Sequence, residues 1–509
     1  MRGEMTLGDI VTGNARRFPD VAAYRLGDRT VTHAALRDRA LRLVSAMAGA
    51  DVQRQDRIAV LSRNSVEFGE LIAATQLSGI ILATVNFRLS PPEMFEVLRR
   101  VGPSIVFYGK EFAVTVGELA PRLPRSPLLV SMGDFEDFIA GADCDDPASK
   151  VLVARPDDIA CLLFTSGTTG ASKCCVLGQR ELRRVALTMN AEMRSGSADR
   201  VLINMPMFHF GAMGIIGGLQ ARGGTVVLQK QFDAAEAVRL IAQERITVLH
   251  LAPVMLRALL DEASDDRTLE SVRTVVYSAA PMTLSTLQRA LAMLPHAGFL
   301  NLYGQTEAIV SGLPRELHGL DGPHPAAALR SVGFPFPGVQ VRIIGVDGRD
   351  VPTGDPGEIV VRSDSCFRGY WDDQAATLTT LRDGWCHTGD IGRFDDRGLL
   401  YLVDRKKDVI ISGGENVYSP EVEDAVSGLD DVAACAVVGT PHERWGEAVC
   451  AVVVPRFGAT LTLGAVQDFV RRRLAGYKIP RRLVIVDQLP LLASGKVDKK
   501  RLRAELSGD

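Results

Sequence analysis

The chain has 509 residues, 46% hydrophobic and 23% charged, a composition typical of a globular protein of about three domain-sized units. Its net charge of −3 argues against a protein whose main task is to bind nucleic acid or an anionic membrane. The sequence has no apolar run of about 20 residues that could cross a membrane, no signal region and no cysteine spacing of a zinc or disulfide site. We therefore expect a cytoplasmic protein with reduced thiols.

Short apolar strands alternate with amphipathic helices through the first 320 residues. The pattern predicts strands at 56–61, 80–85, 159–164, 201–205, 224–229, 248–251 and 274–278. It predicts helices at 65–78, from about 179, at 234–243 and at 283–293. Alternation of this kind favours parallel sheets built from βαβ units. We therefore predict two wound α/β layers in this part of the chain.

The pattern changes after residue 331. Short strands at 339–344, 357–362 and 391–395 contain glycine or proline turns and indicate a small β-barrel. The last 100 residues or so predict strands at 434–439, 448–454 and 483–486 and a helix at 463–474. The predicted fold is α/β. A large N-terminal domain (1–403) of two wound parallel sheets and a small barrel is joined by a hinge (404–408) to a small, mobile α+β domain (409–509).

A loop of hydroxyls and glycines follows the buried strand at 159–164 and ends at a lysine. Glycines let backbone N–H groups turn inward, and hydroxyls and an ammonium group add donors, so the loop suits a polyphosphate. The Walker A order is absent, because Ser172 and Cys174 flank Lys173. A polar turn is the simpler alternative, but two hydroxyl pairs around two glycines favour binding. The candidate phosphate-binding residues are Thr165, Ser166, Gly167, Thr168, Thr169, Gly170 and Lys173.

This loop resembles the T-S-G-T-T-G-x-x-K-G motif of the adenylate-forming superfamily, which includes acyl- and aryl-CoA synthetases, luciferases and peptide-synthetase adenylation domains. The match runs through Lys173, and Cys174 stands where the family usually has glycine. The resemblance covers nearly the whole chain, with the motifs in the family's order, and is closest to bacterial fatty-acid-CoA ligases. It implies an adenylating enzyme that uses ATP, Mg²⁺ and CoA.

The segment Asn301–Glu307 resembles the family's Y-G-x-T-E element. Tyr303 offers a ring face for the purine, next to Gly304, and Thr306 offers a hydroxyl for the α-phosphate. The carboxylate of Glu307 could lie beside a polyphosphate only with Mg²⁺ between them, so Thr306 and Glu307 are the candidate catalytic and metal-binding residues. Without its companion motifs, the segment would equally well be a strand-end turn with an exposed acid.

Two further segments match the family's nucleotide-binding elements. Asp390 lies in a T-G-D element and could accept hydrogen bonds from both ribose hydroxyls. Ser278, Ala279 and Ala280 fit the small-residue strand end that packs against adenine in the family. An aspartate after glycine is ordinarily a turn residue, so both assignments depend on the family context.

The resemblance assigns a second set of roles to the C-terminal part of the chain. Arg405 would contact the ribose or phosphate, Lys407 would be the hinge pivot, and Gly413 and Gly414 would line the pantetheine channel of CoA. Lys496 lies in the family's terminal G-K motif and is the candidate catalytic cation, which would offset the repulsion between carboxylate and α-phosphate. A solvated charge run, a Gly-Gly hairpin turn and an exposed lysine are the simpler alternatives.

His209 lies in a segment that resembles the family's P-x-F-H element. We include it among the catalytic candidates as a wall or gate of the acid site, because an ionised carboxylate needs no base. The neighbouring pocket segments, 204–216, 250–255 and 308–313, are apolar. They offer no lysine or arginine for a second carboxylate, which disfavours diacids.

These observations favour an acyl-CoA synthetase that activates a medium- or long-chain fatty acid with ATP and transfers the acyl group to CoA. The alternatives are an aryl-acid CoA ligase and a free-standing enzyme that loads a carrier protein. A regulatory nucleotide-binding protein without catalysis is a third reading, which Glu307, Asp390 and Lys496 disfavour. The expected partners are small molecules, and a homodimer is the default assembly.

Overall fold

The computed structural model describes residues 5–143, 152–165, 172–263, 266–280, 282–319, 325–491 and 497–507. The chain divides into two compact units, Met1–Val341 with Val361–Cys386 and Arg342–Val360 with His387–Asp509. No helix within the described ranges is long and apolar enough to cross a membrane.

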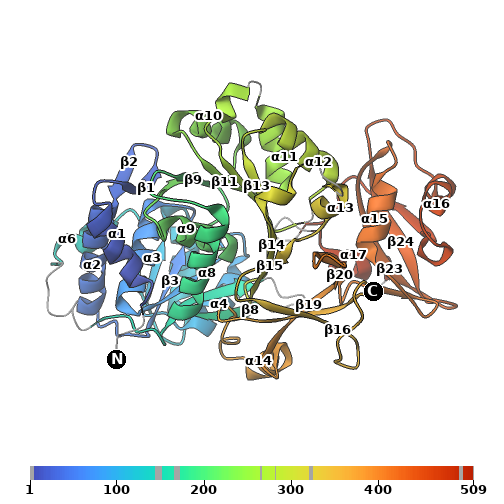
Figure 1. The fold of residues 1–509 in the computed structure, drawn as a ribbon. Coiled ribbons are helices and arrows are strands. Elements are labelled where there is room, and N and C mark those ends of the chain that lie inside the picture. The colour runs from blue at the N-terminus through green and yellow to red at the C-terminus, as the bar shows by residue number, and fades with distance from the viewer. Residues whose placement is uncertain are drawn as a thin grey trace. The chain divides into compact units, whose positions relative to one another are not determined.

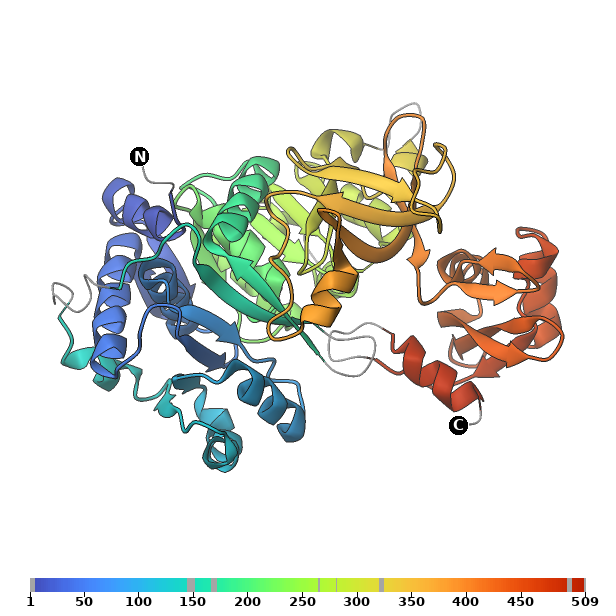
Figure 2. The ribbon, with the colours of Figure 1, turned by 90° about the horizontal axis from the view of Figure 1, so that it is seen from below.

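The first sheet of the larger unit has six strands in the order β6-β5-β3-β4-β7-β8, of which β3 and β8 are labelled in Figure 1. All neighbours are parallel except β7 and β8, which are antiparallel. Helices lie beside this sheet (Figure 2). The apolar side chains of α4 and α5 pack against β3 and β5, as expected for a buried parallel sheet. The strands are β3 (Arg57–Leu61), β4 (Ile81–Thr84), β5 (Ile105–Tyr108), β6 (Leu128–Ser131), β7 (Ile159–Thr165) and β8 (Lys173–Gly178).

The second sheet has nine strands in the order β15-β14-β13-β12-β11-β9-β10-β1-β2. Strands β13, β12, β11, β9, β10 and β1 are parallel neighbours, and β14, β15 and β2 are antiparallel additions at the edges. The carboxyl ends of the parallel strands therefore meet along one edge, where α/β proteins bind ligands. The strands are β1 (Ala22–Leu26), β2 (Arg29–Thr32), β9 (Arg200–Ile203), β10 (Thr225–Leu228), β11 (Val248–Leu251), β12 (Thr274–Tyr277), β13 (Gly298–Gly304), β14 (Ile309–Leu313) and β15 (Phe334–Pro335).

Helix α3 shows the start and stop signals expected from its sequence. Helix α3 begins after Ser65, whose hydroxyl accepts a hydrogen bond from the Phe68 N–H, and ends at Gly79 in the left-handed region. The helices are α1 (Gly8–Arg17), α2 (His33–Gly49), α3 (Val66–Ser78), α4 (Pro91–Val101), α5 (Ala113–Leu119), α6 (Phe135–Ala140), α8 (Gln179–Met193), α9 (Phe210–Gln220), α10 (Ala234–Glu244), α11 (Pro253–Glu262), α12 (Leu284–Met293), α13 (Pro325–Arg330) and α14 (Gln374–Thr380).

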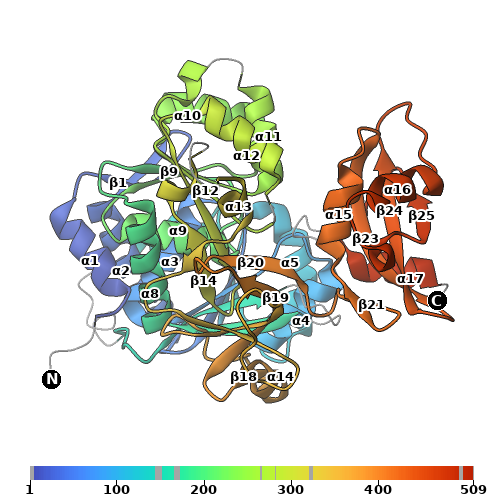
Figure 3. The same cartoon turned by 45° about the vertical axis from the view of Figure 1, so that its right-hand side comes forward.

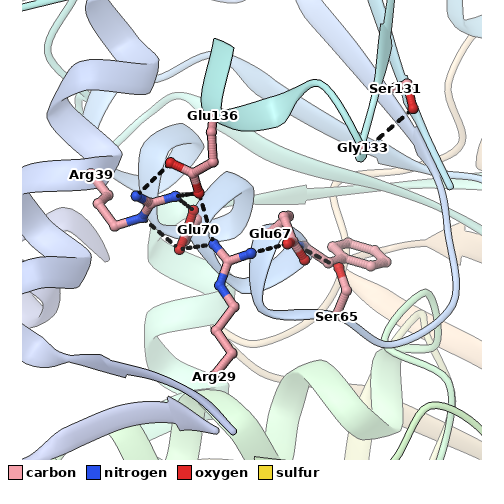
Figure 4. Close-up of polar contacts among 9 residues, drawn as sticks. Arg29, Arg39, Ser65, Glu67, Glu70, Ser131, Gly133 and Glu136 are labelled. Atoms are coloured by element: carbon pink, nitrogen blue, oxygen red, sulfur yellow. Dashed lines mark hydrogen bonds and ion pairs between the residues drawn. The ribbon is translucent and has the colours of Figure 1, made fainter. Parts of the chain in front are cut away.

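A buried glutamate joins helices α2 and α3 to strand β2. Glu70 is fully buried in α3 and accepts hydrogen bonds from Arg39 at 2.8 and 3.0 Å and from Arg29 at 3.2 Å (Figure 4). Both arginines also contact Glu136 in α6. Burial raises the pKa of Glu70, while the two guanidinium groups act in the opposite direction. The ion pairs hold these four elements together.

A five-stranded sheet contains the points at which the chain passes from one unit to the other. Its order is β16-β17-β19-β18, and β20 also pairs with β19. This sheet corresponds to the small β-barrel predicted after residue 331, although its central strand β19 begins earlier than predicted. The strands are β16 (Gln340–Ile344), β17 (Gly357–Arg362), β18 (Leu381–Arg382), β19 (Trp385–Phe394) and β20 (Leu400–Arg405).

The C-terminal part of the second unit is a sheet of order β22-β21-β24-β23, with β25 paired to β24, and helices on two faces (Figure 3). Alternate residues of β23 and β24 face two different cores. Val437 and Val449 pack with α15 and α16, whereas Val438 and Cys450 pack with Leu502 of α17. The predicted α/β class, with two wound parallel sheets and a small α+β part, is confirmed. The elements are β21 (Ile410–Ser412), β22 (Glu415–Val417), α15 (Ser419–Ser427), β23 (Val432–His442), β24 (Gly446–Pro455), α16 (Leu463–Arg471), β25 (Arg482–Ile485) and α17 (Lys499–Ser507).

Candidate active site

The predicted phosphate loop joins the two antiparallel strands β7 and β8. Thr165 and Lys173 lie directly opposite each other at the ends of these strands, and the Thr165 hydroxyl donates to the Lys173 carbonyl at 3.4 Å. The hairpin thus holds both ends of the loop in one place. The intervening candidates Ser166, Gly167, Thr168, Thr169 and Gly170 lie outside the described residues.

Cys174, the departure from the family's loop motif, is a core residue of β8. It pairs with Phe164 across the hairpin and is fully buried among Ile81, Leu162 and neighbouring apolar side chains. Burial raises the pKa of its thiol to about 12. This position therefore contributes to packing beneath the loop and presents no thiolate to a ligand.

Tyr370 connects the phosphate-loop lysine to the candidate metal-binding carboxylate. Its hydroxyl donates to Glu307 Oε1 at 2.8 Å, and the Lys173 ammonium lies 4.7 Å from the centre of its ring, within cation–π range. Burial, together with the negative charge of Glu307, raises the pKa of the Tyr370 phenol, so it keeps its proton and donates. Sequence reasoning missed Tyr370; the available signal was a tyrosine directly after a glycine, Gly369.

The Y-G-x-T-E element forms a tight turn between β13 and β14. Tyr303 is buried at the end of β13, opposite Ser311. A Cβ at Gly304 would lie 2.9 Å from the Ala308 carbonyl, so only glycine fits there. The turn leaves Thr306 partly exposed and buries Glu307. The structure therefore brings Thr306 and Glu307 together at the edge of the sheet where β13 ends.

The small residues predicted to pack on adenine follow β12. Ala279 has φ of +74°, a left-handed conformation that is uncommon without glycine and that costs free energy. Ser278 precedes it and lies 2.9 Å, Oγ to Nε2, from His250 on the neighbouring strand β11. Ala279 and Ala280 are exposed, as a ligand-contacting turn requires.

His209 lies immediately before α9, after the carboxyl end of β9. Its ring is half-buried and packs on Phe208, with the ring centroids 4.3 Å apart. The Phe208 carbonyl accepts a hydrogen bond from Thr84 at 3.0 Å, which fixes this turn to the other sheet. This placement suits a wall of a binding site.

In the second unit, the residue predicted to bind the ribose, Asp390, forms an ion pair with Arg405, which was predicted to contact the ribose or phosphate. Asp390 and Arg405 are direct partners in β19 and β20, and Asp390 Oδ1 lies 2.6 Å from Arg405 Nε. Asp390 is buried after Gly389, which has φ of +68°. The structure therefore brings these two candidates together.

The predicted pivot Lys407 lies exposed in the turn after β20, and acidic residues on either side of it contact later elements. The Asp404 carboxylate accepts hydrogen bonds from the Ser419 N–H and hydroxyl at 2.7 and 3.0 Å. Arg503 in α17 lies 2.7 Å from Asp408. Lys496 is outside the described residues, but the helix that follows it is thus bound to the hinge segment.

Gly413 and Gly414 form the two-residue turn of the β21–β22 hairpin. Their φ angles, +64° and +87°, are those of the glycine-rich turns that suit such hairpins. A Cβ at Gly413 would lie 2.8 Å from the Trp445 ring. The turn alone explains both glycines, and their contact with CoA stays a prediction.

A sheet edge that presents hydroxyls, glycines and a lysine is an arrangement that α/β enzymes use to bind phosphorylated nucleotides. Two family models match: AMP-binding enzyme over residues 11–371 and AMP-binding enzyme C-terminal domain over residues 421–496. A feruloyl-CoA synthase from Amycolatopsis sp is 36% identical over 503 residues, covering 98% of both chains. A fatty acid–[acyl-carrier-protein] ligase from Streptomyces coeruleorubidus is 34% identical over 519 residues, covering 99% of this chain and 97% of that one.

Among solved structures, ATP-bound MatB from Rhodopseudomonas palustris superimposes with a TM-score of 0.89 at 28% identity, over 98% of this chain and 99% of that one. The chain belongs to the AMP-binding enzyme family, the adenylate-forming superfamily whose motifs it carries. The prediction of an AMP-forming acid–thiol ligase is confirmed.

Proposed function

We propose that the protein joins a carboxylic acid to CoA in two steps, through an acyl adenylate. The observation that carries the proposal is the shared contact of Tyr370 with Lys173 and Glu307. It supports a single site in which a cation and a carboxylate lie at the end of a loop suited to phosphates. In the first step the acid attacks the α-phosphate of ATP and pyrophosphate leaves.

Each side chain of this site has a distinct task in the first step. Lys173 and the loop donors bind the departing phosphates, and Thr306 donates to the α-phosphate. Among the described residues, no group of three or more His, Cys, Asp or Glu side chains could hold a metal ion. Glu307 still fits Mg²⁺, which commonly binds through one or two carboxylates plus substrate phosphates and water. When bound, Mg²⁺ would neutralise charge on the phosphates.

The second unit supplies the remaining groups. Asp390 would accept hydrogen bonds from the ribose hydroxyls. Arg405, which pairs with Asp390, would hold the Asp390 carboxylate in place and contact the nucleotide. Lys496 would touch the acid carboxylate and α-phosphate during adenylation. A rotation about Lys407 would then withdraw Lys496 and bring Gly413 and Gly414 to the site, where the CoA thiol attacks the adenylate and AMP leaves.

The proposal has two versions, which differ in the substrate. The acid is a medium- or long-chain fatty acid in the first version and an aromatic acid in the second. The apolar pocket segments and the relative that acts on a fatty acid support the first version. The relative whose name specifies feruloyl-CoA supports the second. The relative named as a fatty acid–[acyl-carrier-protein] ligase supports an alternative in which a carrier protein, and not CoA, accepts the acyl group.

Pyrophosphate release from MgATP, measured over a panel of fatty and aromatic acids with and without CoA, tests the proposal. We expect release with one class of acid, and a thioester only when CoA is present. Glu307→Gln should abolish release, whereas Glu316→Gln, which changes an exposed glutamate beyond the far end of β14, should not. Release without any thioester would point to a carrier-protein acceptor, and no release with any acid would overturn the proposal.

A further inference from the structure

A buried histidine and a half-buried serine form a polar pair in a part of the site that the sequence describes as apolar. His250 is the third residue of β11, and Ser278 follows the neighbouring parallel strand β12. The His250 Nε2 and Ser278 Oγ atoms are 2.9 Å apart. His250 is only 1% exposed, whereas the serine is partly open at the strand end. The serine hydroxyl is thus the part of the pair that a ligand can reach.

The ring of His250 contacts two segments of the predicted site. On one side is Ser278, the first residue of the segment assigned to adenine. On the other side is Gly211 in the first turn of α9, where a Cβ would lie 3.4 Å from His250 Cε1. His209, the predicted wall of the acid site, precedes Gly211 by two residues. The serine hydroxyl therefore lies near the junction of the nucleotide and acid sites.

The structure indicates which atom donates in the hydrogen bond between His250 Nε2 and Ser278 Oγ. His250 Nδ1 is buried and has no hydrogen-bond partner within the described part of the chain. Burial lowers the pKa of His250 to about 4, so the ring is neutral and carries one proton. If that proton were on Nδ1, a buried N–H would be unpaired, which is rare and costly. The proton therefore belongs on Nε2, which donates to Ser278 Oγ.

This direction determines what the serine offers to a ligand. A hydroxyl has one donor and can accept two hydrogen bonds. Because Ser278 accepts from His250, its own proton remains for a hydrogen-bond acceptor, and no second partner for it occurs among the described residues. A neutral pair of this kind does not attract a second carboxylate, but it does suit an uncharged oxygen.

We propose that Ser278, positioned by His250, is a specificity-determining residue that donates a hydrogen bond to an uncharged acceptor oxygen on the carbon skeleton of the acid. The inference rests on the proposed function and narrows its substrate to oxygen-bearing acids, such as keto, methoxy or hydroxy acids. A plain hydrocarbon chain would leave the serine hydroxyl without a partner. One neutral hydrogen bond corresponds to about a tenfold preference in kcat/KM.

The test uses pairs of acids that differ by one oxygen. 3-Phenylpropanoate is compared with its ring-methoxy and ring-hydroxy derivatives, and octanoate with keto-octanoates that carry the oxygen at successive carbons. kcat and KM are measured by pyrophosphate release for each acid. We expect at least one oxygenated acid to exceed its parent by about tenfold in kcat/KM, mainly through a lower KM. Because each variant is tested on both acids, a general loss of activity cancels from the ratio.

Three substitutions of the histidine separate its positioning role from a packing role. In His250→Gln the amide N–H can reach the position of Nε2 and donate to Ser278, so the preference should remain. His250→Phe and the shorter His250→Asn should bring the ratio close to one, as should Ser278→Ala. His318→Phe is the matched control, because it removes another buried histidine that bonds a hydroxyl on β12, that of Tyr277. It should lower stability and leave the ratio unchanged.

The failures of the two proposals are distinguishable. If no acid releases pyrophosphate, the proposed function itself is wrong. If acids react but no pair shows a preference for the oxygenated member, only the role of Ser278 and His250 is wrong. A preference that survives in both His250→Phe and Ser278→Ala would also overturn the inference. Absence of any preference in the wild-type enzyme overturns the inference even if a variant fails to fold.

Discussion

Replacing Tyr370 with phenylalanine removes a single hydroxyl from the link between the phosphate loop and Glu307. The ring would remain, and with it the contact with Lys173 and the packing on Phe367, whose ring centroid lies 4.8 Å away. What is lost is a 2.8 Å hydrogen bond to a buried carboxylate. Hydrogen bonds to charged groups contribute about 1.5–3 kcal/mol. If the bond holds Glu307 in its reactive position, adenylation should slow by about 10- to 150-fold.

The assay is the rate of pyrophosphate release as a function of Mg²⁺ and ATP concentration. A misplaced Glu307 should raise the Mg²⁺ concentration needed for half-maximal rate as well as lower kcat. Tyr401→Phe is the matched control, because it also removes a tyrosine hydroxyl that donates to a carboxylate, that of Asp395, at 3.2 Å. Neither Tyr401 nor Asp395 is a candidate site residue. Equal rates in Tyr370→Phe and wild type, with both proteins folded, would refute the role of this hydroxyl.

Three further predictions concern the catalytic lysine, the unusual cysteine and the buried glutamate. Lys496→Ala should abolish adenylate formation and preserve thioester formation from supplied acyl-AMP, and equal losses in both half-reactions would contradict the proposed domain rotation. Cys174→Gly should retain adenylation activity but lower the free energy of unfolding by about 2 kcal/mol, measured by urea denaturation, because it removes buried apolar surface and introduces glycine into a strand. Glu70→Gln should lower the free energy of unfolding by about 2–3 kcal/mol. Glu136→Gln, at an exposed position, should lower it by at most about 1 kcal/mol. Similar losses in the two variants would contradict the account of the ion pairs.

Local signals were sufficient to predict much of the fold. The serine before α3 and the threonine before α12 cap their helices, and the predicted ranges 65–78 and 283–293 differ from the observed ones by a single residue at their starts. Strand β8 was missed because Lys173 and the two cysteines after it have no alternating pattern. It forms because it pairs with β7, a contact that a local pattern does not contain.

The residues of the candidate site also fall into two groups, those that local motifs identified and those that depend on contacts distant in sequence. The motifs identified Glu307, Asp390 and Arg405, and the last two proved to be direct neighbours across β19 and β20. Tyr370 and His250 were not identified, because each acquires its role from a side chain distant in sequence. His250 in particular lies in a segment of apolar residues, and only the adjacent position of β12 reveals its partner. Such pairs depend on the order of strands in the sheet.

The transfer of oxygen from the acid to AMP tests the central claim most directly. An acid labelled with heavy oxygen in its carboxylate is converted to the thioester with ATP and CoA, and the products are analysed by mass spectrometry. Attack of the carboxylate on the α-phosphate predicts one labelled oxygen in AMP and none in pyrophosphate. Unlabelled AMP, or label in another phosphate product, would contradict the adenylate mechanism for this chain.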